Sequence, residues 1–119
     1  MKSPAQPGAP SDEALSLAID RLWARFLPEI TERVAILERA AKAVAAGNLA
    51  SASRAEAQSA AHKLAGVLGT FGLTRGTVLA RELELTYSRE SAPDPDSGTR
   101  IAAIASELRT MIESRKPAT

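Results

Sequence analysis

The chain has 119 residues, close to the commonest size of a single domain, and 45% of them are hydrophobic, enough for one modest core. The absence of cysteine excludes disulfides, thiolate metal sites and cysteine nucleophiles. The formal net charge of +1 argues against a nucleic-acid-binding protein, which usually carries a concentrated basic excess. No apolar run reaches the roughly 20 residues that cross a bilayer, and no secretory signal is present, so we expect a cytoplasmic protein without a membrane segment.

The first helix is expected to begin after a disordered N-terminal segment. Residues 1–10 contain three prolines and a glycine and offer little that can pack. Ser11 is a suitable N-cap residue before two acidic residues. Four apolar residues then follow at helical spacing: Leu15, Ile19, Leu22 and Phe26. Pro28 interrupts this pattern, and it either opens a second helix as its first residue or kinks a continuous one.

Helical spacing continues beyond Pro28 and ends at a pair of turn-forming residues. The apolar residues of this part are Ile30, Val34, Leu37, Ala41 and Val44. Gly47 and Asn48 both tolerate left-handed backbone, so we expect the helix to end there. Ser53 and Glu56 fit a capping box and predict that the next helix starts near residue 53.

Three further helices are predicted in the second half of the chain. The helix from residue 53 carries an apolar face of Ala57, Ala61, Leu64, Leu68 and Phe71 and should stop near Gly69 and Gly72. The next helix starts at residue 74 or 75 and carries Val78, Leu79, Leu83 and Tyr87. A loop at 91–98 precedes a last helix over 99–115, whose apolar face holds Ile101, Ile104, Leu108, Met111 and Ile112.

These segments predict an all-α protein. No stretch alternates polar and apolar residues with the period of a strand, and amphipathic helices joined by short loops pack against one another. We therefore expect an antiparallel four-helix bundle with an additional or extended N-terminal helix. The predicted domain covers residues 11–116, followed by a short tail at 117–119.

The only histidine, His62, lies away from the apolar face of its helix. At about 100° per residue, it points roughly 130° from the centre of that face. Its neighbours on the helix surface are Gln58, Ser59, Gly66 and Gly69. Because each glycine inside a helix costs about 1 kcal/mol relative to alanine, two of them beside one imidazole need a reason. Either they let a partner's backbone approach the imidazole, or they allow close packing against a neighbouring helix of the same chain.

The segment AHKLAGVLGTFGL resembles the histidine-containing phosphotransfer (Hpt) domains of bacterial phosphorelays. The residues that carry the resemblance are His62, Leu64, Gly66, Gly72 and the pair Leu83-Glu84. It extends over about residues 15–112 and implies a helical bundle in which His62 accepts a phosphoryl group from a receiver aspartate and passes it to another receiver. The resemblance therefore implies a phosphate carrier without a kinase domain or ATP site, and not an enzyme.

The resemblance also implies the partners and the surface that binds them. The expected partners are receiver domains of response regulators, with a hybrid histidine kinase as a further candidate, and neither nucleic acid nor a membrane. The expected binding residues around His62 are Gln58, Ser59, Lys63, Gly66, Gly69 and Thr70, flanked by part of the preceding helix. No cofactor or metal is expected on this chain, because Mg²⁺ and the acidic pocket belong to the receiver. We expect a monomer.

The sequence departs from the family pattern at Ala65. Many Hpt domains carry a lysine there, three residues after the histidine, which steadies the phosphoryl group. Lys63 points about 100° around the helix from His62, so the source of phosphoryl stabilisation is open. One alternative is a non-catalytic helical docking module of a signalling protein. A metal or acid–base enzyme is disfavoured, because one histidine without acidic neighbours on its own helix face provides no ligand set.

Overall fold

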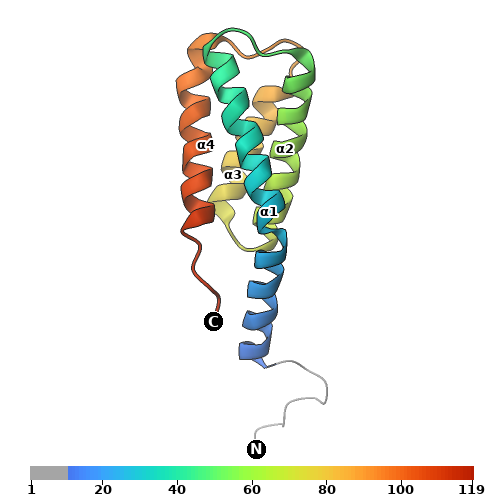
Figure 1. The fold of residues 1–119 in the computed structure, drawn as a ribbon, viewed down its shortest axis with the longest axis vertical. Coiled ribbons are helices and arrows are strands. Elements are labelled where there is room, and N and C mark those ends of the chain that lie inside the picture. The colour runs from blue at the N-terminus through green and yellow to red at the C-terminus, as the bar shows by residue number, and fades with distance from the viewer. Residues whose placement is uncertain (1–10) are drawn as a thin grey trace, which may run out of the picture.

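The computed structural model describes residues 11–119, and the predicted disorder of residues 1–10 lies outside this part. The described chain forms four α-helices: α1 (Asp12–Ala45), α2 (Ser51–Thr70), α3 (Thr74–Tyr87) and α4 (Gly98–Glu113). A short 3₁₀ turn, η1 (Pro95–Ser97), precedes α4. Successive helices run in opposite directions and pack side by side, and no strand occurs in residues 11–119 (Figure 1). The predicted antiparallel four-helix bundle with an extended N-terminal helix is confirmed.

One continuous helix, α1, extends through Pro28. The Ser11 side chain caps it by accepting a hydrogen bond from the backbone N–H of Ala14 at 3.1 Å, as predicted. Pro28 lies inside the helix and does not open a second one. The helix ends where the sequence predicts, because Gly47 adopts a φ of +70° and the Asn48 N–H donates to the carbonyl of Ala43 at 3.0 Å.

The core is built from leucine, isoleucine, valine and alanine, as the composition predicts. The predicted apolar face of α1 beyond Pro28 is buried, and so are the faces of the other helices at Ala57, Leu64, Leu83 and Leu108. Alanine and glycine let the helices approach closely. A methyl group added at Gly98 would lie 3.0 Å from Cα of Ala45, so α1 and α4 touch through their backbones there.

The N-terminal part of α1 projects beyond the end of the bundle, as Figure 1 shows at the bottom of the view. Its apolar residues are 37–47% exposed: Leu15, Leu17, Ile19, Leu22 and Phe26. The expectation that this stripe packs into the bundle is therefore wrong. The helix α2 ends at Thr70, so no helix of the described chain continues alongside the stripe. Val78 of α3, predicted as an apolar-face residue, is 57% exposed as well.

The helix α2 starts earlier than predicted. Its first residue is Ser51, and Ala50 occupies the N-cap position without a side-chain hydrogen bond. Ser53 and Glu56 therefore lie inside the helix, and the predicted capping box is wrong. At the other end, Gly72 has a φ of +73° and the Leu73 N–H donates to the carbonyl of Leu68 at 2.9 Å, which closes the helix as the glycines predict.

The residues after α4 continue beyond the end of the bundle and contact the projecting part of α1 (Figure 1). The backbone N–H of Ala118 donates to Asp20 at 2.7 Å, and Thr119 and Arg115 donate to the same carboxylate. The Arg115 guanidinium also lies 4.8 Å from the ring centroid of Trp23. The hydrogen bond from Ala118 is the main cause that lowers the pKa of Asp20. We call residues 114–119 the C-terminal strap.

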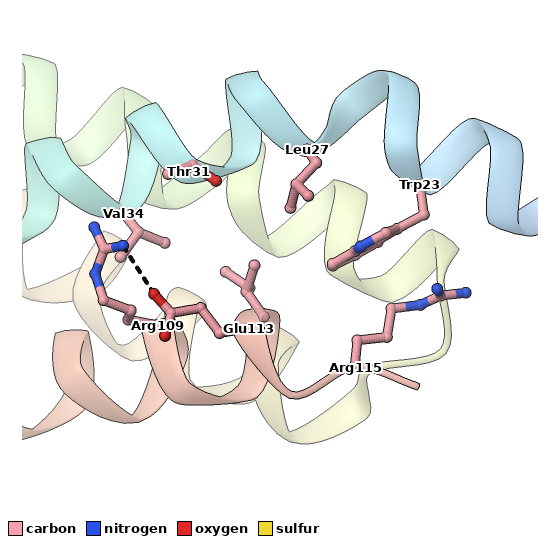
Figure 2. A pocket seen from close by; sticks show the side chains of 8 residues that line it. Trp23, Leu27, Thr31, Val34, Arg109, Glu113 and Arg115 are labelled. Carbon is pink, nitrogen blue, oxygen red and sulfur yellow. Dashed lines mark hydrogen bonds and ion pairs between the residues drawn. The ribbon is translucent and has the colours of Figure 1, made fainter. Parts of the chain in front are cut away.

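A cavity of about 370 Å³ lies between α1 and α4, and Figure 2 shows the side chains around it. Trp23 and Arg115 line one end, and Arg109 and Glu113 form an ion pair at the other. Arg109 also donates two hydrogen bonds, of 2.6 and 2.7 Å, to Glu38 of α1. These hydrogen bonds lower the pKa of Glu38 and tie α4 to α1.

Candidate functional site

His62 lies near the middle of α2, with its side chain 69% exposed to solvent. The residues on the opposite face of the same helix, Leu64 and Leu68, are completely buried. The prediction that the imidazole faces away from the core is therefore confirmed. A side chain in this position can enter the active site of another protein without any change in the bundle.

A carboxylate from the neighbouring helix holds the imidazole. Oε2 of Glu84, on α3, lies 2.6 Å from Nδ1 of His62. An ionised carboxylate only accepts hydrogen bonds, so Nδ1 carries the proton and donates it. In the neutral ring the lone pair is then on Nε2, which makes no hydrogen bond within residues 11–119. The contact thus selects the tautomer in which the outward nitrogen is the nucleophile.

Reasoning from the helix of His62 alone did not assign Glu84 to the site. The helix that carries His62 offers no acidic residue at helical spacing beside the histidine. The carboxylate belongs to a different helix, 22 residues further along the chain, and only the packing of α2 on α3 brings it to the imidazole. The pair Leu83-Glu84 in the family signature was the one signal that pointed to it.

The two glycines beside His62 have different surroundings. A methyl group built on Gly66 would have no atom within 4 Å outside its own helix, so the space above Gly66 is open. The same methyl on Gly69 would lie 3.3 Å from the Thr77 hydroxyl of α3. Close packing within the chain therefore accounts for Gly69. At Gly66 no internal neighbour requires a glycine, which favours access by a partner.

The other predicted binding residues surround His62 at different levels of exposure. Ser59 and Lys63 are exposed and line a groove of about 510 Å³ between α1 and α2, so part of α1 flanks the site as expected. Gln58 is half-buried. The Thr70 hydroxyl is exposed and donates to the carbonyl of Gly66 at 3.1 Å.

The exposed face of α2 around His62 carries mostly small side chains. Its members are Ala52, Ala55, Ser59, Gly66 and Thr70. These side chains leave the imidazole as the most prominent group on this face. We call these five residues the small-residue face.

The position that departs from the family pattern is buried. Ala65 is only 1% exposed, and its carbonyl accepts a hydrogen bond from the Thr77 hydroxyl of α3 at 3.2 Å. No side chain from position 65 contributes charge at His62.

Two further features bear on the chemistry of the site. In residues 11–119, no three histidine or acidic side chains gather in a way that could hold a metal ion. Within the same residues, no helix is both long and apolar enough to cross a membrane. The cavity of Figure 2 lies between α1 and α4, whereas His62 and Glu84 join α2 to α3, so the cavity is not part of the candidate site.

Comparison with known proteins agrees with this geometry. The sequence model of the Hpt domain matches residues 21–116. Protein RcaC of Microchaete diplosiphon is 28% identical over 95 residues, which are 80% of this chain and 15% of RcaC. The chain therefore spans only a small part of the length of this relative. No solved structure matches the chain significantly.

The family is shown by a match over most of the chain, and the helical bundle with its exposed histidine agrees with it. Hpt domains are phosphotransfer modules of phosphorelays, distinct from kinases, and they act together with receiver domains. The chain belongs to the Hpt domain family and is a histidine phosphotransfer domain.

Proposed function

We propose that His62 is the phosphoacceptor of this domain. The observation that carries the proposal is the contact between Nδ1 of His62 and Glu84, which leaves Nε2 free on an exposed side chain. The open space at Gly66 supports it, because the backbone of a receiver can approach within one helical turn of the imidazole. Gln58, Ser59, Lys63 and Thr70 lie around this approach and contribute to the binding surface.

The transfer requires little from the chain beyond a positioned nucleophile. The lone pair of Nε2 attacks the phosphorus of an aspartyl-phosphate, the N–P bond forms, and the P–O bond breaks with its electron pair left on the aspartate carboxylate. The proton on Nδ1 stays in place, so the product ring is a cation. Glu84 stabilises that cation through the same hydrogen bond. Attack by the aspartate of a second receiver reverses these bond changes.

The remaining machinery belongs to the partner in this proposal. His62 projects from a convex helix, so the receiver surrounds the phosphoryl group and supplies Mg²⁺, while this chain holds no cofactor and no ATP site. The chain then acts as a carrier and not as an enzyme that turns over a substrate. We further propose that it works as a monomer with response-regulator receivers, including that of a hybrid histidine kinase. The cytoplasm is the proposed location, because phosphorelays draw on ATP there.

The test is transfer of label from a receiver. Candidate receivers are phosphorylated with ³²P, separated from the phosphodonor and mixed with this chain. We expect acid-labile label on the wild-type chain, as for a phosphohistidine, and none on a folded His62→Gln variant. Label that persists on His62→Gln would show that a different residue is the phosphoacceptor. A chain that binds the phosphorylated receivers and takes no label from them would be a docking module instead.

A further inference from the structure

The structure points to the residue that replaces the missing lysine beside the phosphoryl group. Position 65 carries a buried alanine, so the positive charge has to come from elsewhere. Two exposed cationic side chains flank His62: Lys63 on its own helix and Arg81 on α3. Arg54, also on α2, already binds within the bundle, because its NH1 donates to the carbonyl of Tyr87 at 2.7 Å.

The register between α2 and α3 places Arg81 at the level of the missing lysine. His62 contacts Glu84. About two helical turns further along this antiparallel pair of helices, Gly69 lies against Thr77. The second contact is seven residues after the first along α2 and seven residues before it along α3. Ala65 is three residues after His62 on α2, and Arg81 is three residues before Glu84 on α3. Arg81 therefore stands beside the turn of α2 where the family's lysine arises.

We propose that Arg81 binds the phosphoryl group on His62, with Glu84 holding both side chains ready; this inference rests on His62 being the phosphoacceptor. NH1 of Arg81 lies 3.9 Å from Oε1 of Glu84, while Oε2 of the same carboxylate holds the imidazole. The Arg81 side chain is 61% exposed, and this loose ion pair is its only polar contact with the described residues. It can therefore move to a phosphoryl group without breaking a strong interaction.

A guanidinium suits this role by its geometry. Its planar donors match the oxygens of a phosphoryl group. When the guanidinium of Arg81 moves from Glu84 to the phosphoryl group, it exchanges one anionic partner for another. When His62 becomes a cationic phosphoimidazole, Glu84 stabilises the ring and Arg81 becomes available for the dianion.

Lys63 is the weaker candidate. It points about 100° around α2 from His62, toward α1. The groove that it lines carries three carboxylates, from Glu29, Glu32 and Glu56. These carboxylates attract the lysine away from His62, and they would repel a phosphoryl group that moved toward it.

The proposal is tested with phosphoramidate, a small phosphodonor that requires no receiver. Nε2 attacks its phosphorus, the N–P bond of the donor breaks, and the already protonated amine leaves as ammonia with the electron pair. The five proteins compared are the wild type, Arg81→Gln, Arg81→Lys, Lys63→Gln for the other cation near His62, and Lys42→Gln. Lys42→Gln is the matched control, because it removes one exposed cation from the side of α1 that faces α4. Phosphohistidine is followed by ³¹P NMR, and folding by circular dichroism.

We expect Arg81→Gln to load about threefold to fivefold less phosphoryl group at steady state, the size of one exposed charge contact. The difference should shrink at high salt, because exposed charges are screened, and Arg81→Lys should recover most of it. These two results separate a charge effect from a merely structural one. Lys42→Gln should behave as the wild type, and Lys63→Gln should lose less than Arg81→Gln.

Loading of Arg81→Gln equal to that of the wild type would overturn the assignment. A loss in Lys63→Gln as large as that in Arg81→Gln would overturn it too. So would equal losses in Arg81→Gln and Lys42→Gln, since the effect would then be that of overall charge. Failure of the wild type itself to form phosphohistidine would instead remove the proposed phosphoacceptor, and His62→Gln run beside it distinguishes this outcome.

Discussion

Gly66 and Gly76 are both helical glycines, but only one of them is required by packing. No atom outside its own helix lies within 4 Å of a methyl group built on Gly66. The same methyl on Gly76 would lie 2.8 Å from Cδ1 of Leu68 and 3.1 Å from Sδ of Met111. This difference agrees with the proposed role of Gly66 in partner access, whereas Gly76 is required by the core.

We predict that Gly66→Gln keeps the fold and blocks phosphotransfer from a receiver. Replacing glycine in an exposed helix should stabilise the domain by up to about 1 kcal/mol, while the long side chain fills the space through which a receiver approaches. Stability is measured by thermal unfolding and transfer with a ³²P-labelled receiver. Normal transfer by the folded variant would show that the receiver does not approach over this face.

Gly76→Ala is the matched control and should show the opposite pattern. The added methyl meets the buried Leu68 side chain, so we expect a loss of about 1 to 3 kcal/mol in the free energy of unfolding. Gly76 is buried on α3 and the open surface at Gly66 stays as it is, so the folded fraction should transfer phosphate normally.

The sequence predicts part of the candidate site, and the reason for the limit is visible at Glu84. The exposure of His62 follows from helical geometry within one helix. The carboxylate of Glu84, 2.6 Å from Nδ1 of His62, comes from α3. Its position depends on the register between α2 and α3, and the spacing of apolar residues within each helix does not determine that register. The two roles considered for Gly69 stayed open for the same reason, since Thr77 is its neighbour across that interface.

Helix ends show how far local sequence determines the elements. The left-handed residues Gly47 and Gly72 end α1 and α2 as predicted, because their backbone conformation is a local property. The start of α2 was predicted two residues late, since a serine and a glutamate at capping-box spacing do not act as a cap unless the chain turns there. Pro28 left two alternatives open, and the structure shows one continuous helix through it.

The C-terminal strap should detach from α1 in acid. The pKa of Asp20 is lowered in the folded protein, chiefly by the hydrogen bond from Ala118. A carboxyl group with a lowered pKa stabilises the folded contact above its ordinary pKa, and this contribution disappears as the pH falls through the folded value. Arg115 lies over Trp23, the only tryptophan, so the fluorescence of Trp23 should change as the pH falls below about 4, the ordinary pKa of an aspartate.

The control for the strap is Asp20→Asn. This variant should show the acid-type fluorescence of Trp23 already at neutral pH, with the same helical circular dichroism as the wild type. If it titrates like the wild type, the fluorescence change comes from another carboxylate, such as Glu38, whose pKa is also lowered.

The whole molecule is longer than a compact domain of its size. The described chain measures 66 × 24 × 22 Å and has a radius of gyration of 17.8 Å, against about 13 Å for a compact chain of this length. The excess comes from the projecting part of α1, with its exposed Leu15, Ile19, Leu22 and Phe26 (Figure 1). Burial patterns in the sequence could not show this, because an apolar stripe has the same spacing whether or not another helix covers it.

We predict an elongated monomer in solution. X-ray scattering should give the mass of one chain and a radius of gyration well above the compact value. Each of the apolar residues on the projecting part of α1 is more than half covered within the chain, so we expect no stable dimer through them and the same mass for an Ile19→Glu variant. A dimer mass for the wild type that Ile19→Glu reduces to one chain would contradict this prediction.

The small-residue face of α2 has a consequence for the choice between partners. This face presents mostly backbone and short side chains, so it offers few groups that could select one receiver over another. Its members are Ala52, Ala55, Ser59, Gly66 and Thr70. Discrimination then depends on the longer side chains at the margins of the face, such as Gln58 and Lys63. A few substitutions at those margins can redirect the domain to a different receiver while the chemistry at the histidine is unchanged.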